Sequence, residues 1–139
     1  MTASKSEQIL AAAITAITPT AGISGRIYRD RYEAVSRGEM PAIVVLPQSE
    51  DQQEIVIPFT DTDLLVSVDI IINGAPLSTL ADPVRVSMHQ LLMADRTLGG
   101  LAHSIEPAGA QWDAESGEIG VLRCSYRFTF RTLTDDLTQ

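Results

Sequence analysis

The segment from residue 118 to residue 131 constrains the fold more strongly than any other part of the chain. Large apolar side chains alternate in it with polar and basic ones. The apolar row is Leu122, Cys124, Tyr126, Phe128 and Phe130, and the opposite row is Arg123, Ser125, Arg127, Thr129 and Arg131. This alternation predicts a long β-strand with one buried face. The apolar row needs a packing partner, and the basic row faces water or another molecule.

The overall composition is that of one globular domain spanning residues 1–139. The chain is 45% hydrophobic and 20% charged, and a domain of this length buries roughly 68% of the surface of its unfolded chain. We expect residues 1–5 and 133–139 to be flexible. The apolar runs are too short to span a bilayer, and no signal peptide is expected. The single cysteine, Cys124, excludes an internal disulfide and favours the cytoplasm.

The first half of the chain predicts a helix followed by four strands. Ser4 or Ser6 is expected to cap a helix that ends at Thr18-Pro19. A short strand is expected near Ile27, and a strand covered on both faces at 42–46. The polar segment 47–53 predicts a loop. Segments 55–59 and 64–72 are expected to form a hairpin around a turn at 60–63, with Ile55, Ile57 and Phe59 facing inward.

The second half predicts one helix and two strands. Leu80, Val84, Met88, Leu91 and Leu92 form its helical stripe. This helix begins either at Asp82-Pro83 or near Leu77, which would place Pro83 inside it. Pro107 and Gly109 predict an edge strand or a bulge within 103–112, and a hairpin loop follows at 113–117. The expected order is α-β-β-β-β-α-β-β. This is an α+β fold, a largely antiparallel (mixed) β-sheet with two helices packed on one face.

The charge pattern suggests contacts between proteins. The net charge of −8 disfavours direct binding to nucleic acid. Two interpretations of the basic row stay open: salt bridges to neighbouring strands, for example to Asp69, or contacts with acidic loops of another copy. A second cluster mixes arginine and tyrosine, which are enriched at interfaces. The candidate interface residues are Arg26, Tyr28, Arg29, Arg31, Tyr32, Asp61, Asp63, Arg123, Arg127 and Arg131.

No residue pattern points to catalysis, a metal or a cofactor. The carboxylates Asp61 and Asp63 fall in a predicted turn, where solvated charge is the usual state, and Asp61-Thr62-Asp63 lacks the other ligands of a calcium loop. His89 has no second ligand at a useful spacing. Cys124 lies on the apolar row and is expected to be a small buried side chain. We therefore expect a protein that is not an enzyme.

Three segments resemble a known family. In residues 25–46, Gly25-Arg26-Ile27-Tyr28 with Arg31 precedes Met40-Pro41-Ala42 and an apolar run. The later segments are residues 91–100, with Leu98-Gly99-Gly100 at their end, and the closing strand 126–132. In this order they resemble the tail terminator (minor tail, or tail completion) proteins of long-tailed bacteriophages and prophages.

The resemblance implies a structural role. Members of this family form a ring, typically of six subunits, that caps the tail tube, ends its polymerisation and presents a surface for head attachment. The implied partners are further copies of the chain, the tail tube protein and a head–tail connector protein, without a membrane. The implied locations are the host cytoplasm during assembly and then the virion tail. Two alternatives stay open: a head–tail joining subunit of similar fold, or a small-molecule-binding α+β module.

Overall fold

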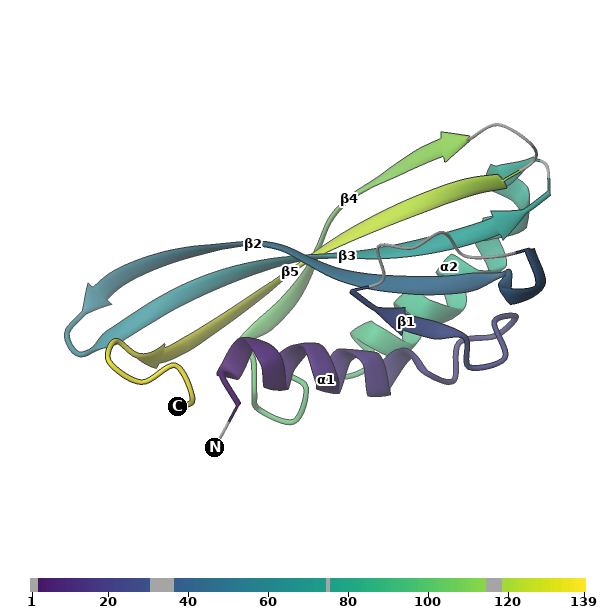
Figure 1. The fold of residues 1–139 in the computed structure, drawn as a ribbon. Helices are drawn as coiled ribbons and strands as arrows, with labels where there is room; N and C mark the ends of the chain where they lie inside the picture. Colours follow the sequence, from purple (N-terminus) through teal and green to yellow (C-terminus); the bar gives the residue numbers. More distant parts are fainter. Residues whose placement is uncertain (1–2, 31–36, 75, 115–118) are drawn as a thin grey trace.

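A computed structural model describes residues 3–30, 37–74, 76–114 and 119–139 (Figure 1). Within these ranges the chain forms two α-helices, one short 3-10 helix and five strands. In chain order they are α1 (Lys5–Ile17), β1 (Ile27–Arg29), η1 (Arg37–Glu39), β2 (Ala42–Val56), β3 (Phe59–Asn73), α2 (Leu77–Met93), β4 (Ser104–Ala114) and β5 (Ile119–Leu133).

The strands form one sheet in the order β1-β2-β3-β5-β4. β1 runs parallel to β2, and every other pair is antiparallel. Both helices lie on the same side of this sheet (Figure 1). The α+β class, the largely antiparallel mixed sheet and the placing of both helices on one face are therefore confirmed. We call the side that faces the helices the inner face and the opposite side the outer face.

β5 is the long strand with one buried face that its alternation predicts. It pairs with β3 on one side and with β4 on the other. Its apolar row is buried on the inner face, and Phe128 is only 1% exposed. The same core contains the buried sides of α1 and α2 and the apolar residues of β2 and β3 that point inward. The strand is therefore held by pairing along both edges and by packing beneath it.

The two helices begin for different reasons. The Ser4 hydroxyl accepts a hydrogen bond of 3.2 Å from the backbone N–H of Glu7, the N-terminal cap expected for α1. α2 begins at Leu77 and has Pro83 inside it, so the earlier of the two possible starts is correct. The early start buries Leu77 beside Gly120, where a Cβ atom would lie 2.8 Å from a Leu77 methyl carbon.

The predicted loop at 47–53 and the predicted turn at 60–63 are wrong, because both segments belong to strands. The short strands expected at 42–46 and 55–59 are one continuous strand, β2, and the turn that joins it to β3 is Ile57-Pro58. Polar residues persist in these strands because they form an arm that projects beyond the helices (Figure 1). On its inner face, Thr60 and Thr62 are buried, and β-branched threonine suits a strand.

Two further predictions about inward-facing residues are also wrong. Ile57 and Phe59 are exposed at the end of the arm, because the hairpin turns there. Leu80 is exposed on α2, whose buried residues are Leu77, Ala81, Val84, Met88 and Leu92. The prediction for Ile55 concerns a side chain outside the described part of the chain.

The remaining parts of the fold are the edge strand β4 and the C-terminal segment. β4 is an edge strand with a register shift between Pro107 and Gly109, as predicted. Asp113 and Ala114, the first two residues of the loop predicted at 113–117, belong to β4 instead, and residues 115–117 lie outside the described residues. The C-terminal segment folds back beside the arm, where the Thr134 N–H donates a hydrogen bond of 2.7 Å to the Pro58 carbonyl oxygen.

Candidate assembly surfaces

The basic row of β5 lies on the outer face, and two of its three arginines are paired within the chain. The guanidinium of Arg123 lies 3.2 Å from a carboxylate oxygen of Asp69 on β3. That of Arg131 lies 2.7 Å from Asp61, also on β3, and Arg131 holds the pKa of Asp61 below its usual range by hydrogen bonding. The expected cross-strand salt bridge to Asp69 is confirmed.

The two acidic candidates therefore lie on a strand and not in a turn. Asp61 and Asp63 are opposite Arg131 and Thr129 in the register of β3 with β5. The Thr129 hydroxyl donates a hydrogen bond of 2.9 Å to Asp63. The structure thus brings the acidic and basic candidates together inside one chain, which leaves these carboxylates less available to a second copy.

Arg127 differs from its two neighbours in the basic row. It lies between Leu65 and Glu106 in the sheet register and its side chain is exposed. It forms no ion pair with any residue that the structure describes. Of the three row arginines, Arg127 is therefore the one whose charge is available to a partner.

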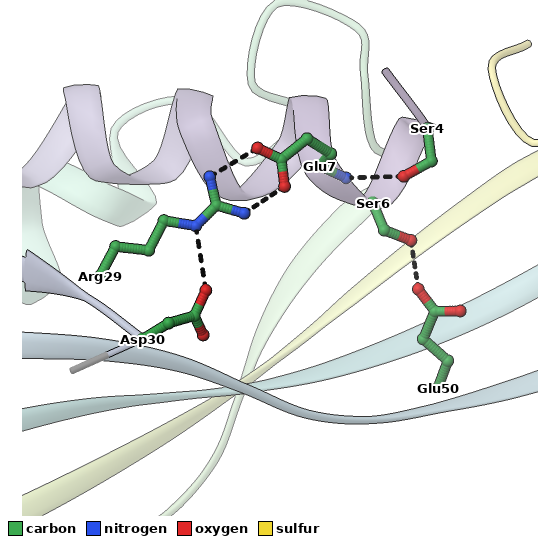
Figure 2. Close-up of polar contacts among 6 residues, drawn as sticks. All are labelled: Ser4, Ser6, Glu7, Arg29, Asp30 and Glu50. Carbon is green, nitrogen blue, oxygen red and sulfur yellow. Dashed lines mark hydrogen bonds and ion pairs between the residues drawn. The ribbon is translucent and has the colours of Figure 1, made fainter. Parts of the chain in front are cut away.

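Arg29, a member of the second predicted cluster, lies near the N-terminal end of α1 (Figure 2). Arg29 at the end of β1 donates hydrogen bonds from both terminal guanidinium nitrogens to the Glu7 carboxylate, and the bond from Nη1 to Oε1 is 2.7 Å long. Its Nε lies 3.5 Å from a carboxylate oxygen of Asp30. Hydrogen bonding to Arg29 lowers the pKa of Glu7, and the same contact raises the pKa of Arg29. Beside this pair, Ser6 donates a hydrogen bond to Glu50 on β2.

The described members of this cluster consequently contact other parts of the same chain. Arg29 ties β1 to α1, and Arg26 donates a hydrogen bond of 3.0 Å to the Pro41 carbonyl oxygen. Tyr28 packs against Ala42 and Val44 on the outer side of β2. The remaining two candidates, Arg31 and Tyr32, lie outside the described residues.

A groove of about 410 Å³ follows the edge of β2 next to this cluster. β1 pairs with β2 only at residues 43–45, so no other described strand lies beside the rest of that edge. The lining includes Ser6, Glu7, Arg29 and Glu50, which already contact one another in two pairs. The polar groups that line the groove are thus largely occupied within the chain.

The end of the arm carries an exposed apolar patch that sequence reasoning missed. Val56, Ile57 and Phe59 form this tip patch, and the Ile57 side chain is 80% exposed. The signal was present in the sequence, because apolar residues occupy both alternating positions around Pro58. A strand buried on one face would show them at every second position only.

A second exposed apolar surface lies where α2 meets β4. Val86 and Trp112 are 48% and 51% exposed, and the guanidinium of Arg85 lies 5.5 Å from the centre of the Trp112 ring. Next to them is a groove of about 350 Å³, lined by Asp82, Arg85, Val86, His89 and Gln90. We call Arg85, Val86 and Trp112 the flank patch. Sequence reasoning missed it because Val86 lies off the helical stripe.

The buried ionisable groups are packed in the core. Burial raises the pKa of the Cys124 thiol to about 11, and Cys124 is buried as expected. Burial also raises the pKa of Tyr126, whose hydroxyl lies 2.8 Å from Nδ1 of His89. Within the described residues, no three or more His, Cys, Asp or Glu side chains are grouped as metal ligands would be. In the same ranges, no helix is both long and apolar enough to cross a membrane.

Comparison with known proteins gives a similarity of fold. No protein-family model matches the chain, and no curated protein matches its sequence. Among solved structures, a chain of the virion of the native gene transfer agent (GTA) particle is similar, with a TM-score of 0.62 and 15% sequence identity. The match covers 88% of this chain and 93% of that chain. At this level of identity, the match shows a shared fold.

Proposed function

We propose that this protein is a structural subunit of a phage-like particle that forms a ring on the end of the tail tube. The ring ends tube polymerisation and presents the surface to which the head attaches. The observation that carries the proposal is the fold shared with a GTA virion chain over nearly the whole length of both chains. The resemblance of residues 25–46 and 126–132 to tail terminator proteins supports the same role.

The shape of the subunit suits assembly into a ring. A ring closes when each subunit uses two different surfaces, one for each neighbour. The chain has two exposed apolar patches on separate elements, one at the end of the arm and one on α2 and β4. Exposed apolar patches on a protein surface often mark sites of contact with other proteins. Both features therefore support a subunit that contacts other subunits.

The proposed partners follow from this role. They are further copies of the chain, in a ring of six, the tail tube protein and the head–tail connector protein. Assembly takes place in the host cytoplasm, and the ring stays in the virion tail. Direct contact with nucleic acid is not part of the proposal, because β2 and β3 carry acidic side chains and no Lys or Arg, which phosphate would repel.

Deleting the gene from the prophage that carries it tests the proposal. After induction, the particles are examined by negative-stain electron microscopy. We expect overlong or ragged tails without heads, and normal particles when the gene is restored in trans. Tails of normal length lying beside full heads would indicate a head–tail joining subunit instead. Normal infectious particles would contradict both roles.

A further inference from the structure

We propose that the tip patch of one subunit docks on the flank patch of a second copy of the chain. This inference deepens the proposed function, on which it rests, because it assigns the contact that links neighbouring subunits of the ring. It commits to one occupant for each surface: the arm of a neighbour for the flank patch, and α2 with β4 of a neighbour for the tip patch.

The tip patch is shaped to enter a groove. It sits on a two-residue turn at the end of a long hairpin that projects beyond the helices (Figure 1). Ile57 is the most exposed large apolar residue in the described ranges, and Val56 and Phe59 flank it. Anchors that bury an aliphatic or aromatic side chain in a partner's pocket typically contribute most of the binding energy of an interface.

The flank patch offers a matching recess. The groove of about 350 Å³ on α2 lies beside Val86 and Arg85, and Arg85 in turn stacks on Trp112. Tryptophan and arginine are the residue types most enriched among interface hot spots. The arrangement thus combines a groove that contains Val86 among polar side chains with a large, half-exposed aromatic side chain nearby.

Distance excludes a contact between the two patches of one subunit. Phe59 is opposite Leu133 on β5, and Trp112 is opposite Leu122 on the same strand. Eleven residues separate these two β5 positions, which is about 36 Å at the rise of a β-strand. Contact between the patches therefore joins two copies, and because the patches differ, it continues from subunit to subunit until a ring closes.

The charges beside the two patches are complementary. Glu54, next to the tip patch, is exposed and has no ion-pair partner among the described residues. Arg85 in the flank patch likewise has no carboxylate within ion-pair distance in the described chain, although Asp82 lines the same groove. Docking would bring together a carboxylate and a guanidinium that have no ion-pair partner among the described residues, a pairing that favours the proposed orientation.

Sedimentation analysis of purified full-length protein tests this contact. The variants are Ile57→Asp at the tip and Val86→Asp at the flank, both at exposed positions, with Ala11→Asp on exposed α1 surface as the charge-matched control. We expect the wild type and the control to form species larger than a dimer as the concentration approaches about 1 mM. Each tip or flank variant alone is expected to stay monomeric.

An equal mixture of the two variants gives the decisive result. The Ile57→Asp subunit keeps an intact flank, and the Val86→Asp subunit keeps an intact tip, so one productive contact can form between them. We expect a dimer and nothing larger. Larger assemblies in the mixture, association of Ile57→Asp alone, or a wild type that stays monomeric throughout would each overturn the proposed contact.

Exchanging the charges at Glu54 and Arg85 tests the proposed contact independently. We expect Glu54→Arg and Arg85→Glu each to raise the dissociation constant, and their combination in one chain to recover at least about tenfold of that loss. Absence of any recovery would contradict the proposed orientation. These experiments use purified protein, so failure here combined with overlong tails in the deletion strain would remove the contact and leave the tail role standing.

Discussion

Arg123 and Asp69 lie directly opposite each other on β5 and β3, with 3.2 Å between the guanidinium Nε and a carboxylate oxygen. The Asp69 side chain is 8% exposed, whereas that of Arg123 is about half exposed. The pair raises the pKa of Arg123 because the guanidinium is hydrogen-bonded to the carboxylate. Arg123 thus neutralises the nearly buried carboxylate of Asp69 on the outer face.

The first prediction follows from that ion pair. Arg123→Glu places a second carboxylate against Asp69, and we expect it to lower the free energy of unfolding by about 2–4 kcal/mol, since half of the pair is solvent-screened. Arg127→Glu changes the charge of the same strand equally at a position that has no ion pair among the described residues, although it lies opposite Glu106, and is expected to cost about 1 kcal/mol or less. Urea unfolding measures both. Equal effects would contradict the assignment.

Truncation of the buried aromatic row tests the inner face. Phe128→Ala is expected to cost about 3–5 kcal/mol, because it removes a ring that is packed on all sides. Phe59→Ala removes the same group from the exposed end of the arm and is expected to cost about 1 kcal/mol or less. Thermal or urea unfolding compares the two. A small effect of Phe128→Ala would mean that the two faces of β5 are assigned wrongly.

The contact between Glu7 and Arg29 predicts a pH dependence. Because the pKa of folded Glu7 lies below its ordinary value of 4.5, the folded state binds this proton less tightly than the unfolded chain. The contact therefore stabilises the fold at pH values above the ordinary pKa of glutamate. Its contribution to the free energy of unfolding is lost as the pH falls through the lowered pKa of folded Glu7. Glu7→Gln should reduce stability at neutral pH and converge with the wild type in acid.

Urea midpoints measured across the acid range check this convergence. Glu54→Gln is the control, because it removes an equal charge from an exposed residue without an ion pair among the described residues. A constant difference between Glu7→Gln and the wild type at every pH would show that the contact contributes nothing through ionisation.

Removal of the helix cap gives a further prediction. Ser4→Ala leaves the Glu7 N–H without its side-chain acceptor, and we expect a loss of about 1 kcal/mol. Ser78→Ala makes the same substitution on exposed helix surface in α2, whose N-terminal end has no side-chain cap, and should change stability little. Chemical unfolding monitored by circular dichroism distinguishes them. Identical losses would argue against a stabilising cap at Ser4.

The last prediction concerns thiol reactivity. With a pKa of about 11, only about a thousandth of Cys124 is thiolate at pH 8, and the side chain is buried. We expect the folded protein to resist an aromatic disulfide reagent and to react completely in urea. Cys124 is the single cysteine, so the absorbance reports one site. Rapid reaction in native buffer would contradict its burial.

Sequence patterns that repeat over many residues predicted the structure well. The alternation in β5, the cap and the end of α1, and the edge character of β4 around Pro107 all match the structure. The ion pair between Arg123 and Asp69 also matches one of the two interpretations of the basic row. These signals are local and periodic, because side chains on one face of a strand or helix recur at a fixed spacing.

The arm shows where local reasoning failed. Polar and acidic residues at 47–53 and 60–63 have turn-like composition, yet pairing with β3 and β5 extends them as strands. A strand that projects into solvent has little apolar surface to bury, so its alternation is faint. Local reasoning also left open which candidate interface residues are paired within the chain, because Arg29 and Arg131 find partners only when distant segments meet.

By itself, the sequence determined the α+β class, the inner face of β5 and the ends of the first helix, because these depend on hydrophobic periodicity and capping within a short window. Only the tertiary structure decided which charges are satisfied within the chain and which apolar side chains remain exposed. Such outcomes depend on strand register and on the length of the arm, which bring together residues far apart in the chain. The tip and flank patches are therefore visible only in the folded molecule.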